Sequence, residues 1–158
     1  MQPAAAPDDL TPLHPDYLKV VRIGWTLLAV PVLIGAAVLE IAGLLPRGAV
    51  LVPTLLVAAF AVGLVPPRRY RARGYRLDPD RLRVARGTLF RSDTVVPFGR
   101  VQHIDVAQGP VERFYGLATL VLHTAGNHNA SVRLPGLPHA EALAIREAIR
   151  THVLRETP

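Results

Sequence analysis

The sequence contains no cysteine, a single lysine and few aromatic residues. Without cysteine, the chain can form neither a disulfide framework nor a thiolate metal site, which fits a reducing compartment. Lys19 is the only lysine among 18 basic residues, so arginine carries nearly all of the positive charge. The net charge of +6 therefore comes from side chains that suit anionic partners.

The sequence also lacks the motifs of common catalytic sites. It contains no Gly-rich phosphate loop, no H-E-x-x-H pair and no Gly-x-Ser-x-Gly elbow. His123 and His128, with an asparagine on each side of His128, have a spacing that fits no standard metal site and is more typical of a hairpin loop. His103 and Asp105 are two residues apart, which places both on the solvated face of a strand. The sequence predicts no enzyme activity, no catalytic residue, no cofactor and no metal site.

Two long apolar runs dominate the first half of the chain, at about residues 23–45 and 48–65. The second run carries no charge over 18 residues, which meets the length of a bilayer span. A pair of buried helices in a soluble protein is the alternative, but about ninety remaining residues could not cover two helices that are apolar on every face. The sequence therefore predicts a transmembrane hairpin within residues 17–67.

Glu40 is the one acidic residue in the first apolar run. At about 1.5 Å of rise per residue, it lies about 25 Å beyond Ile23, near the far edge of the bilayer. The favoured interpretation is a carboxylate that reaches the headgroups, and the alternative is a functional acid inside the membrane.

Basic residues predict the orientation of the hairpin. Pro46-Arg47 forms a short turn, so the two spans are antiparallel and both termini lie on the same side. Only Arg47 lies on the turn, whereas the other ends carry Lys19, Arg22 and the cluster Arg68, Arg69, Arg71 and Arg73. Positive residues remain in the cytoplasm, so both termini are predicted to be cytoplasmic. The aromatic residues predicted to anchor the interface are Tyr17, Trp25 and Tyr70.

The regions before and after the predicted hairpin differ in composition and in hydrophobic periodicity. Residues 1–16 are rich in Pro, Ala and Asp and predict a disordered tail. Residues 68–158 contain short runs of period two, which predict strands at 75–77, 81–86, 88–91, 94–97, 101–106, 117–123 and 131–134. Leu82 and Val84 should face the core, with Arg81 and Arg83 outward. Residues 110–115 predict one helical turn.

A last amphipathic helix is predicted over residues 139–154. Its apolar stripe consists of Ala142, Ile145, Ile149 and Val153. Several short strands followed by one such helix indicate an antiparallel sheet that the helix caps. The fold class is therefore an α+β membrane protein, with a cytoplasmic domain over residues 68–158.

The arginines of residues 68–100 favour an anionic partner. Because they follow a predicted membrane span, anionic lipid is a simpler explanation than nucleic acid. Within residues 68–86, Tyr70 and Tyr75 are the only aromatics interleaved with the arginines, and no nucleic-acid motif is present, so nucleic-acid binding is disfavoured. The candidate headgroup contacts are Arg68, Arg69, Arg71 and Arg73.

Several segments together resemble a known family. They are Tyr75-Arg76-Leu77, Leu82 to Leu89, Val96-Pro97-Phe98-Gly99-Arg100-Val101-Gln102-His103-Ile104, Gln108 to Ala118 and Leu122-His123-Thr124-Ala125-Gly126. The sequence resembles the bacterial pleckstrin-homology-like (PH-like) membrane proteins, with a match over about residues 73–152 and the preceding two-helix anchor.

The resemblance implies a partly open β-barrel of about seven strands with a C-terminal helix at one end, in a bacterial inner-membrane protein. It implies no catalytic residue and no ligand. It also implies a membrane complex with a larger relative that carries several copies of the domain. The motif residues interpreted as structural are Gln102, Gly109, Pro110, Arg113, Gly116, Thr124 and Gly126. Arg113 is expected to bond strand-end carbonyls, and Gly116 to supply a backbone angle that side chains disfavour.

Two functions follow from these features. The first is a membrane-anchored interaction or scaffold subunit, whose sheet edge or strand–helix groove binds a protein partner in the membrane. The second is a module that senses anionic membrane lipids through the arginine cluster. The sequence predicts no particular oligomeric state.

Overall fold

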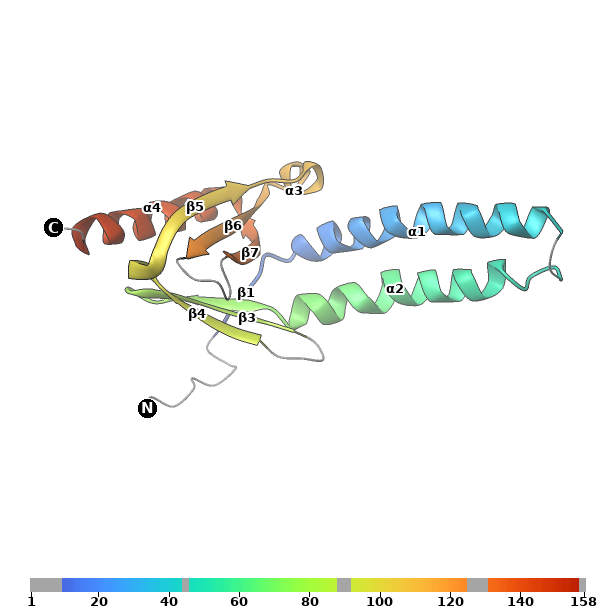
Figure 1. The fold of residues 1–158 in the computed structure, drawn as a ribbon, viewed down its shortest axis with the longest axis horizontal. Helices are drawn as coiled ribbons and strands as arrows, with labels where there is room; N and C mark the ends of the chain where they lie inside the picture. Colours follow the sequence, from blue (N-terminus) through green and yellow to red (C-terminus); the bar gives the residue numbers. More distant parts are fainter. Residues whose placement is uncertain (1–9, 44–45, 88–91, 125–130, 157–158) are drawn as a thin grey trace. The chain divides into compact units, whose positions relative to one another are not determined.

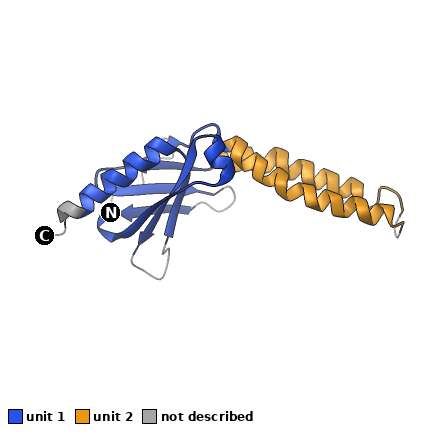
Figure 2. Cartoon of the chain, turned by 90° about the horizontal axis from the view of Figure 1, so that it is seen from above, with its two compact units in different colours: residues 1–17, 71–158 blue, residues 18–70 orange. Residues whose placement is uncertain are grey.

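The computed structural model describes residues 10–43, 46–87, 92–124 and 131–156. The chain divides into two compact units, coloured separately in Figure 2. One unit consists of residues 18–70, and the other combines residues 1–17 with residues 71–158.

The smaller unit is the helical hairpin that the sequence predicts. Helix α1 (Tyr17–Ile41) has 25 residues and helix α2 (Leu51–Arg71) has 21. At 1.5 Å per residue they extend about 37 and 31 Å, enough to cross a hydrocarbon layer of about 30 Å. Only 6% of the most apolar window of each helix is buried. Both helices therefore expose apolar side chains on most of their surface, as bilayer spans do.

The helix ends differ from the predicted runs. Helix α2 continues through Pro66 and Pro67 to Arg71, so Arg68, Arg69 and Arg71 belong to its last turns. Proline already holds the helical φ, and a span tolerates the loss of its N–H bond. The connection between the helices extends from Ala42 to Val50, longer than the predicted two-residue turn, and its residues 44–45 lie outside the described part.

Glu40 has a role in this connection that neither interpretation of the sequence included. Its carboxylate accepts hydrogen bonds from the backbone N–H groups of Gly48, Val50 (3.3 Å) and Leu51 (3.0 Å). These N–H groups belong to the first residue of α2 and to residues just before it, where no internal helical acceptor is present. A residue of α1 therefore caps α2, which joins the two helices at the turn.

The described residues of the larger unit form two antiparallel sheets (Figure 1). The first has the order β1-β2-β3-β4, and the second has the order β5-β6-β7. The strands are β1 (Thr11–Pro12), β2 (Gly74–Leu77), β3 (Arg81–Arg86), β4 (Ser92–Pro97), β5 (Val101–Ala107), β6 (Leu117–Thr124) and β7 (Ser131–Pro138). The strand predicted at 88–91 and the loop predicted at 127–129 fall outside the described residues.

The described part of this unit also contains a 3-10 turn, a short helix and a long C-terminal helix. A 3-10 turn, η2 (Phe98–Arg100), connects the two sheets, and α3 (Pro110–Phe114) connects β5 to β6. The last element, α4 (His139–Glu156), packs on the strands of the second sheet (Figure 1). The predicted antiparallel sheet with a capping helix is confirmed, and its strands form two sheets with α4 on the second.

The core follows the predicted alternation. Leu82 and Val84 of β3 are buried, as expected from period two. From α4, Ala142, Ile145 and Ile149 are buried, and Val153 is half-buried. The largest buried side chains of the second sheet are Leu117, Leu120, Leu122, Val132, Leu134 and Leu137. The hydrophobic contact between this sheet and α4 closes one face of the domain.

The start of the chain belongs partly to this domain, which differs from the tail predicted over residues 1–16. Strand β1 pairs with β2 through Thr11↔Tyr75 and Pro12↔Gly74, and Leu13 is 3% exposed. Two paired residues and one buried leucine are too short to produce a periodic pattern, so the sequence did not reveal them. The hairpin is therefore inserted between the first and second strands of the domain.

Tyr17, the last residue of this N-terminal segment, is also held by the domain. Its ring covers Gly136, which has φ +73°, and a Cβ at position 136 would lie 2.6 Å from Tyr17 Cγ. Arg73 Nη1 donates a hydrogen bond of 2.5 Å to the Tyr17 hydroxyl. The chain thus leaves the domain at Tyr17 and re-enters it near Arg73, at adjacent points. We call the contacts of Tyr17 with Gly136 and Arg73 the Tyr17 closure.

A second tyrosine joins the two halves of the sandwich. The Tyr75 hydroxyl on β2 donates a hydrogen bond of 2.5 Å to Glu141 Oε1 on α4, and Tyr75 is 6% exposed. Burial, followed by the bond to Glu141, raises the pKa of the Tyr75 phenol. The neutral hydroxyl is the form that holds the first sheet to α4.

A pair of glycine substitutions tests the Tyr17 closure. Gly136→Ala places a methyl group against a buried ring at positive φ, and we expect a loss of about 3 kcal/mol in domain stability. Gly116→Ala is the matched control, because Gly116 has φ +65° but no atom within 4 Å of a Cβ. It should lose only about 1 kcal/mol, the cost of the backbone angle.

Thermal unfolding of the full-length protein in detergent measures both losses. Adding Tyr17→Ala to Gly136→Ala should remove the clash, so the double variant should lose less than the two single losses combined. Equal losses for Gly136→Ala and Gly116→Ala would contradict the proposed contact.

Candidate interaction groove

The turn between β2 and β3 fixes the position of η2. Asp78-Pro79-Asp80 supplies residues that favour a turn, and the Asp78 N–H donates to the carbonyl of Arg81 at 2.9 Å. The Phe98 N–H donates to the carbonyl of Asp80, also at 2.9 Å. Phe98 is therefore held beside the turn, with its ring 3% exposed.

A groove of about 450 Å³ lies between this turn and the second half of α4. The Phe98 ring forms part of its wall and meets the imidazole of His152 edge to face, at 5.4 Å between centroids. Its wall is mostly apolar with a few polar groups, which is the usual composition of a binding pocket. The residues that line it are Leu77, Asp78, Pro79, Phe98, Ala148, Thr151 and His152.

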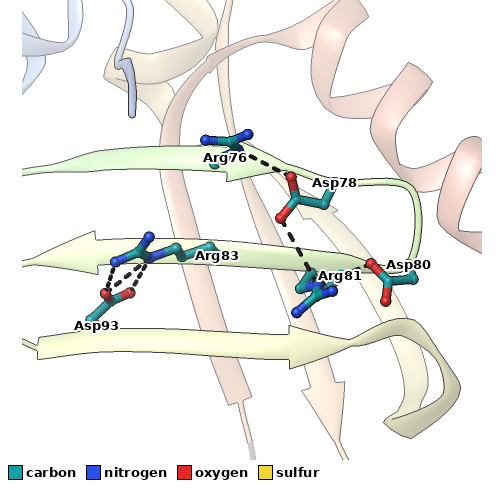
Figure 3. Close-up of polar contacts among 6 residues, drawn as sticks. All are labelled: Arg76, Asp78, Asp80, Arg81, Arg83 and Asp93. Carbon is teal, nitrogen blue, oxygen red and sulfur yellow. Dashed lines mark hydrogen bonds and ion pairs between the residues drawn. The ribbon is translucent and has the colours of Figure 1, made fainter. Parts of the chain in front are cut away.

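Alternating acidic and basic side chains follow the strands beside the groove (Figure 3). Arg76 Nε contacts Asp78 Oδ1 at 3.1 Å, and Arg81 Nε contacts Asp80 Oδ1 at 2.9 Å. Further along, Arg83 of β3 holds both carboxylate oxygens of Asp93 of β4. Of the two arginines predicted to face outward, Arg81 is 43% exposed and contacts aspartates of the turn, whereas Arg83 is 15% exposed and contacts Asp93 of the neighbouring strand.

These ion pairs change the electrostatic character of the domain surface. The hydrogen bond from Arg81 lowers the pKa of Asp80, which therefore stays ionised across physiological pH. Asp78 lies at the lip of the groove and is shared between Arg76 and Arg81 (Figure 3). The positive charge of residues 76–83 is thus largely balanced, and it contributes less to an anionic partner than the sequence alone indicates.

The candidate headgroup contacts fall into two groups. Arg68, Arg69 and Arg71 have exposed side chains in the last turns of α2. Arg69 also lies over the indole ring of Trp25, 5.3 Å from its centroid. Arg73 instead lies in the domain, where its side chain contacts Tyr17.

The three predicted interface anchors also differ in environment. Tyr17 is 7% exposed and covered by the domain, as described above. Trp25 and Tyr70 are half-buried residues of the hairpin helices. The contact of Tyr17 with Gly136 was not visible in the sequence, because the two residues are more than one hundred positions apart.

The family motif around α3 forms a set of local hydrogen bonds. Glu112 accepts from the Gly109 N–H (2.8 Å) through one carboxylate oxygen and from the Thr119 hydroxyl (2.7 Å) through the other. Gln108 Nε2 donates to the carbonyl of Leu117 at 2.7 Å. Pro110 occupies the first helical position, where no N–H is needed. Gln108 and Glu112 therefore hold the turn, and both lie in the motif segment from Gln108 to Ala118, although the sequence does not mark either as structural.

The other motif residues interpreted as structural differ in exposure and in the element to which they belong. Gly116 has the predicted positive φ, and its carbonyl accepts from the His139 N–H at 2.9 Å. Gln102 and Arg113 have exposed side chains, and Thr124 pairs with Val101 across the second sheet. Gly126 lies outside the described residues.

One polar cluster lies on the outer face of the second sheet. Asp105 of β5 contacts His103 Nε2 at 2.8 Å and His123 Nε2 at 3.4 Å. All three side chains are at least 43% exposed. Within the described part of the chain, no group of three or more His, Cys, Asp or Glu residues has the arrangement of a metal site. The cluster is a solvated surface feature of the sheet.

The geometry defines a class of protein: a PH-like domain joined at two adjacent points to a hydrophobic hairpin. The sequence model of the family described as "Bacterial PH domain" matches residues 18–153. The chain belongs to the bacterial PH domain family.

A curated relative agrees with this assignment. The UPF0699 transmembrane protein YdbS of Bacillus subtilis (strain 168) is 30% identical over 148 residues, which cover 87% of this chain and 88% of that protein. No solved structure matches the chain significantly. The two candidate spans and the transmembrane relative together identify a membrane protein.

Proposed function

We propose that the protein is a non-catalytic, membrane-anchored interaction subunit whose PH-like domain binds a protein partner in the strand–helix groove. The groove itself is the observation that supports this function. It is apolar at Leu77, Phe98 and Ala148, and it lies where the β2–β3 turn, η2 and α4 meet. A rigid concave surface built from three elements suits recognition of a short segment of another protein.

The chemistry of the groove indicates the kind of segment that fits. Its apolar wall favours an aliphatic or aromatic side chain as the anchor. Asp80 of the turn is exposed, and Asp78 lies on the lip, so a basic residue next to the anchor would be complementary. We propose as partner a membrane protein with such a segment, such as a relative that carries several PH-like domains.

The proposed location is the inner membrane, with the domain in the cytoplasm. The basic residues at the domain-proximal ends of both helices support this orientation. The groove would then face cytoplasmic segments of membrane partners. A reporter fused to the C-terminus and found outside the cell would contradict the orientation.

A substitution that fills the groove tests the proposed function. Ala148→Trp should project an indole into the groove and displace the anchor side chain of the partner. Ala144→Trp is a matched control, because Ala144 is also exposed on α4 but one turn earlier and outside the lining. Affinity purification from native membranes, followed by quantitative mass spectrometry, measures each co-purified protein.

We expect at least one abundant partner to fall about tenfold or more with Ala148→Trp and to be retained with Ala144→Trp, because a blocked anchor pocket removes a hot spot. Partners that are recovered equally with both variants would contradict binding through the groove.

Exposed arginines in the last turns of α2 support a second candidate function, the sensing of anionic lipid. Arg68, Arg69 and Arg71 extend beyond the apolar part of the helix, where headgroups carry charge. Each basic residue near such a surface contributes about 1 kcal/mol. We infer that they adjust the contact of a domain that the hairpin already anchors.

Native mass spectrometry of the full-length protein with phosphatidylglycerol tests this candidate. Replacing Arg68, Arg69 and Arg71 by Gln should weaken lipid retention by up to about a hundredfold. The same replacement at Arg76, Arg81 and Arg83 is the control, and it should have a smaller effect because these arginines already contact aspartates. Equal losses in the two triple variants would contradict a specific role for the helix end.

A further inference from the structure

Phe114 is the most exposed large apolar side chain among the described residues of the PH-like domain. It is 83% exposed, whereas the next ones in this unit, Val95 and Leu77, are 48% and 43% exposed. Its ring meets that of Tyr115 edge to face at 5.2 Å between centroids, and the adjacent Arg113 is exposed. An aromatic ring beside a basic side chain is the composition of a membrane-interface contact.

The segment that carries Phe114 is held rigidly. Glu112 and Gln108 bind the turn through the hydrogen bonds described above, and the Arg113 N–H donates to the carbonyl of Gly109 at 2.9 Å. The exposed ring is therefore not on a free loop that could fold back onto the domain. Keeping a phenyl ring in water costs free energy, which a partner with an apolar layer would remove.

The position of this turn in the domain indicates which partner would cover the Phe114 ring. Gly116 bonds to His139, and Leu117 pairs with Pro138, so the end of α3 adjoins the C-terminal end of β7. Gly136, near the same end of β7, packs against the ring of Tyr17. From the strand spacing, Phe114 and Tyr17 lie within roughly 20 Å of each other at one end of the domain.

That end of the domain is where the chain passes into the hairpin. Helix α1 begins at Tyr17 itself, and α2 ends at Arg71, two residues before the contact of Arg73 with Tyr17. The chain therefore passes from the domain into each span within a few residues. Along α1, Tyr17 is about 9 Å from Ile23, where the apolar run begins, which is comparable to the thickness of one headgroup layer.

We propose that Phe114 and Arg113 form a second membrane contact of the domain, with the Phe114 ring in the interfacial layer of the bilayer and Arg113 among the headgroup phosphates. The contact adds a third point to the two covalent connections at Tyr17 and Arg71. Three points that do not lie on one line define the tilt of a rigid domain relative to the bilayer surface. The inference depends on the membrane location of the chain and not on binding of a partner in the groove.

A tryptophan reporter at position 114 tests this contact in the full-length protein. Trp25 is the only native tryptophan, so Trp25→Phe leaves a background without tryptophan fluorescence. Phe114→Trp is introduced into that background and reconstituted into vesicles of phosphatidylethanolamine and phosphatidylglycerol. The control carries Arg150→Trp, because the Arg150 side chain is 68% exposed and lies about 16 Å along α4 from His139. Lipids brominated near the headgroup quench tryptophans that reach the interface.

We expect quenching of Phe114→Trp by brominated lipid at least about twofold stronger than that of Arg150→Trp, with emission shifted to shorter wavelength. Equal, weak quenching of both reporters would overturn the proposal. A blue shift at position 114 without quenching by brominated lipid would also overturn it, because the ring would then be covered by protein, such as a second copy of the chain. Unchanged far-UV circular dichroism of both variants shows that the comparison concerns folded protein.

Discussion

The Tyr17 closure is the constraint on which the rest of the structure depends. The hairpin is inserted between β1 and β2, so a single domain must hold both chain segments that lead to the membrane. The ring of Tyr17 on Gly136 and its hydrogen bond with Arg73 hold these segments side by side. Glu40 holds the other end of the hairpin, where its carboxylate caps α2. Each end of the hairpin is thus fixed by side-chain contacts as well as by chain connection.

This arrangement separates the positive charge of the chain into two groups. Arg76 and Arg81 contact aspartates of the β2–β3 turn, and Arg83 contacts Asp93 of β4, so these arginines mainly stabilise the surface of the first sheet. The arginines at the end of α2 remain exposed next to the apolar run. The charge next to the spans is therefore distinct from the charge within the domain. Within the domain, the groove beside Phe98 and the turn around Phe114 lie on separate elements: the groove involves η2 and α4, and the turn involves α3.

Local patterns predict most of this fold. Uncharged runs predict the two spans, alternation places Leu82 and Val84 in the core, and the three- and four-residue spacing of Ala142, Ile145 and Ile149 predicts the buried face of α4. The features that sequence did not reveal depend on contacts between distant residues. Strand β1 has two residues and no period, and the cap from Glu40 requires the hairpin to close first. The groove likewise combines a turn, a 3-10 segment and a helix end that are far apart in the chain.

The most direct test of the Tyr17 closure removes the hairpin and keeps the contacts. In one variant, a short Gly/Ser linker replaces residues 18–70 and joins Tyr17 to Arg71; a second variant begins at Arg71 and lacks residues 10–17. Thermal unfolding of the two is compared by circular dichroism. If β1, Leu13 and Tyr17 belong to the domain, the linked variant is soluble, unfolds cooperatively and has a clearly higher Tm than the fragment without them. Equal Tm values would show that the segment before the hairpin contributes nothing to the domain and would contradict the closure.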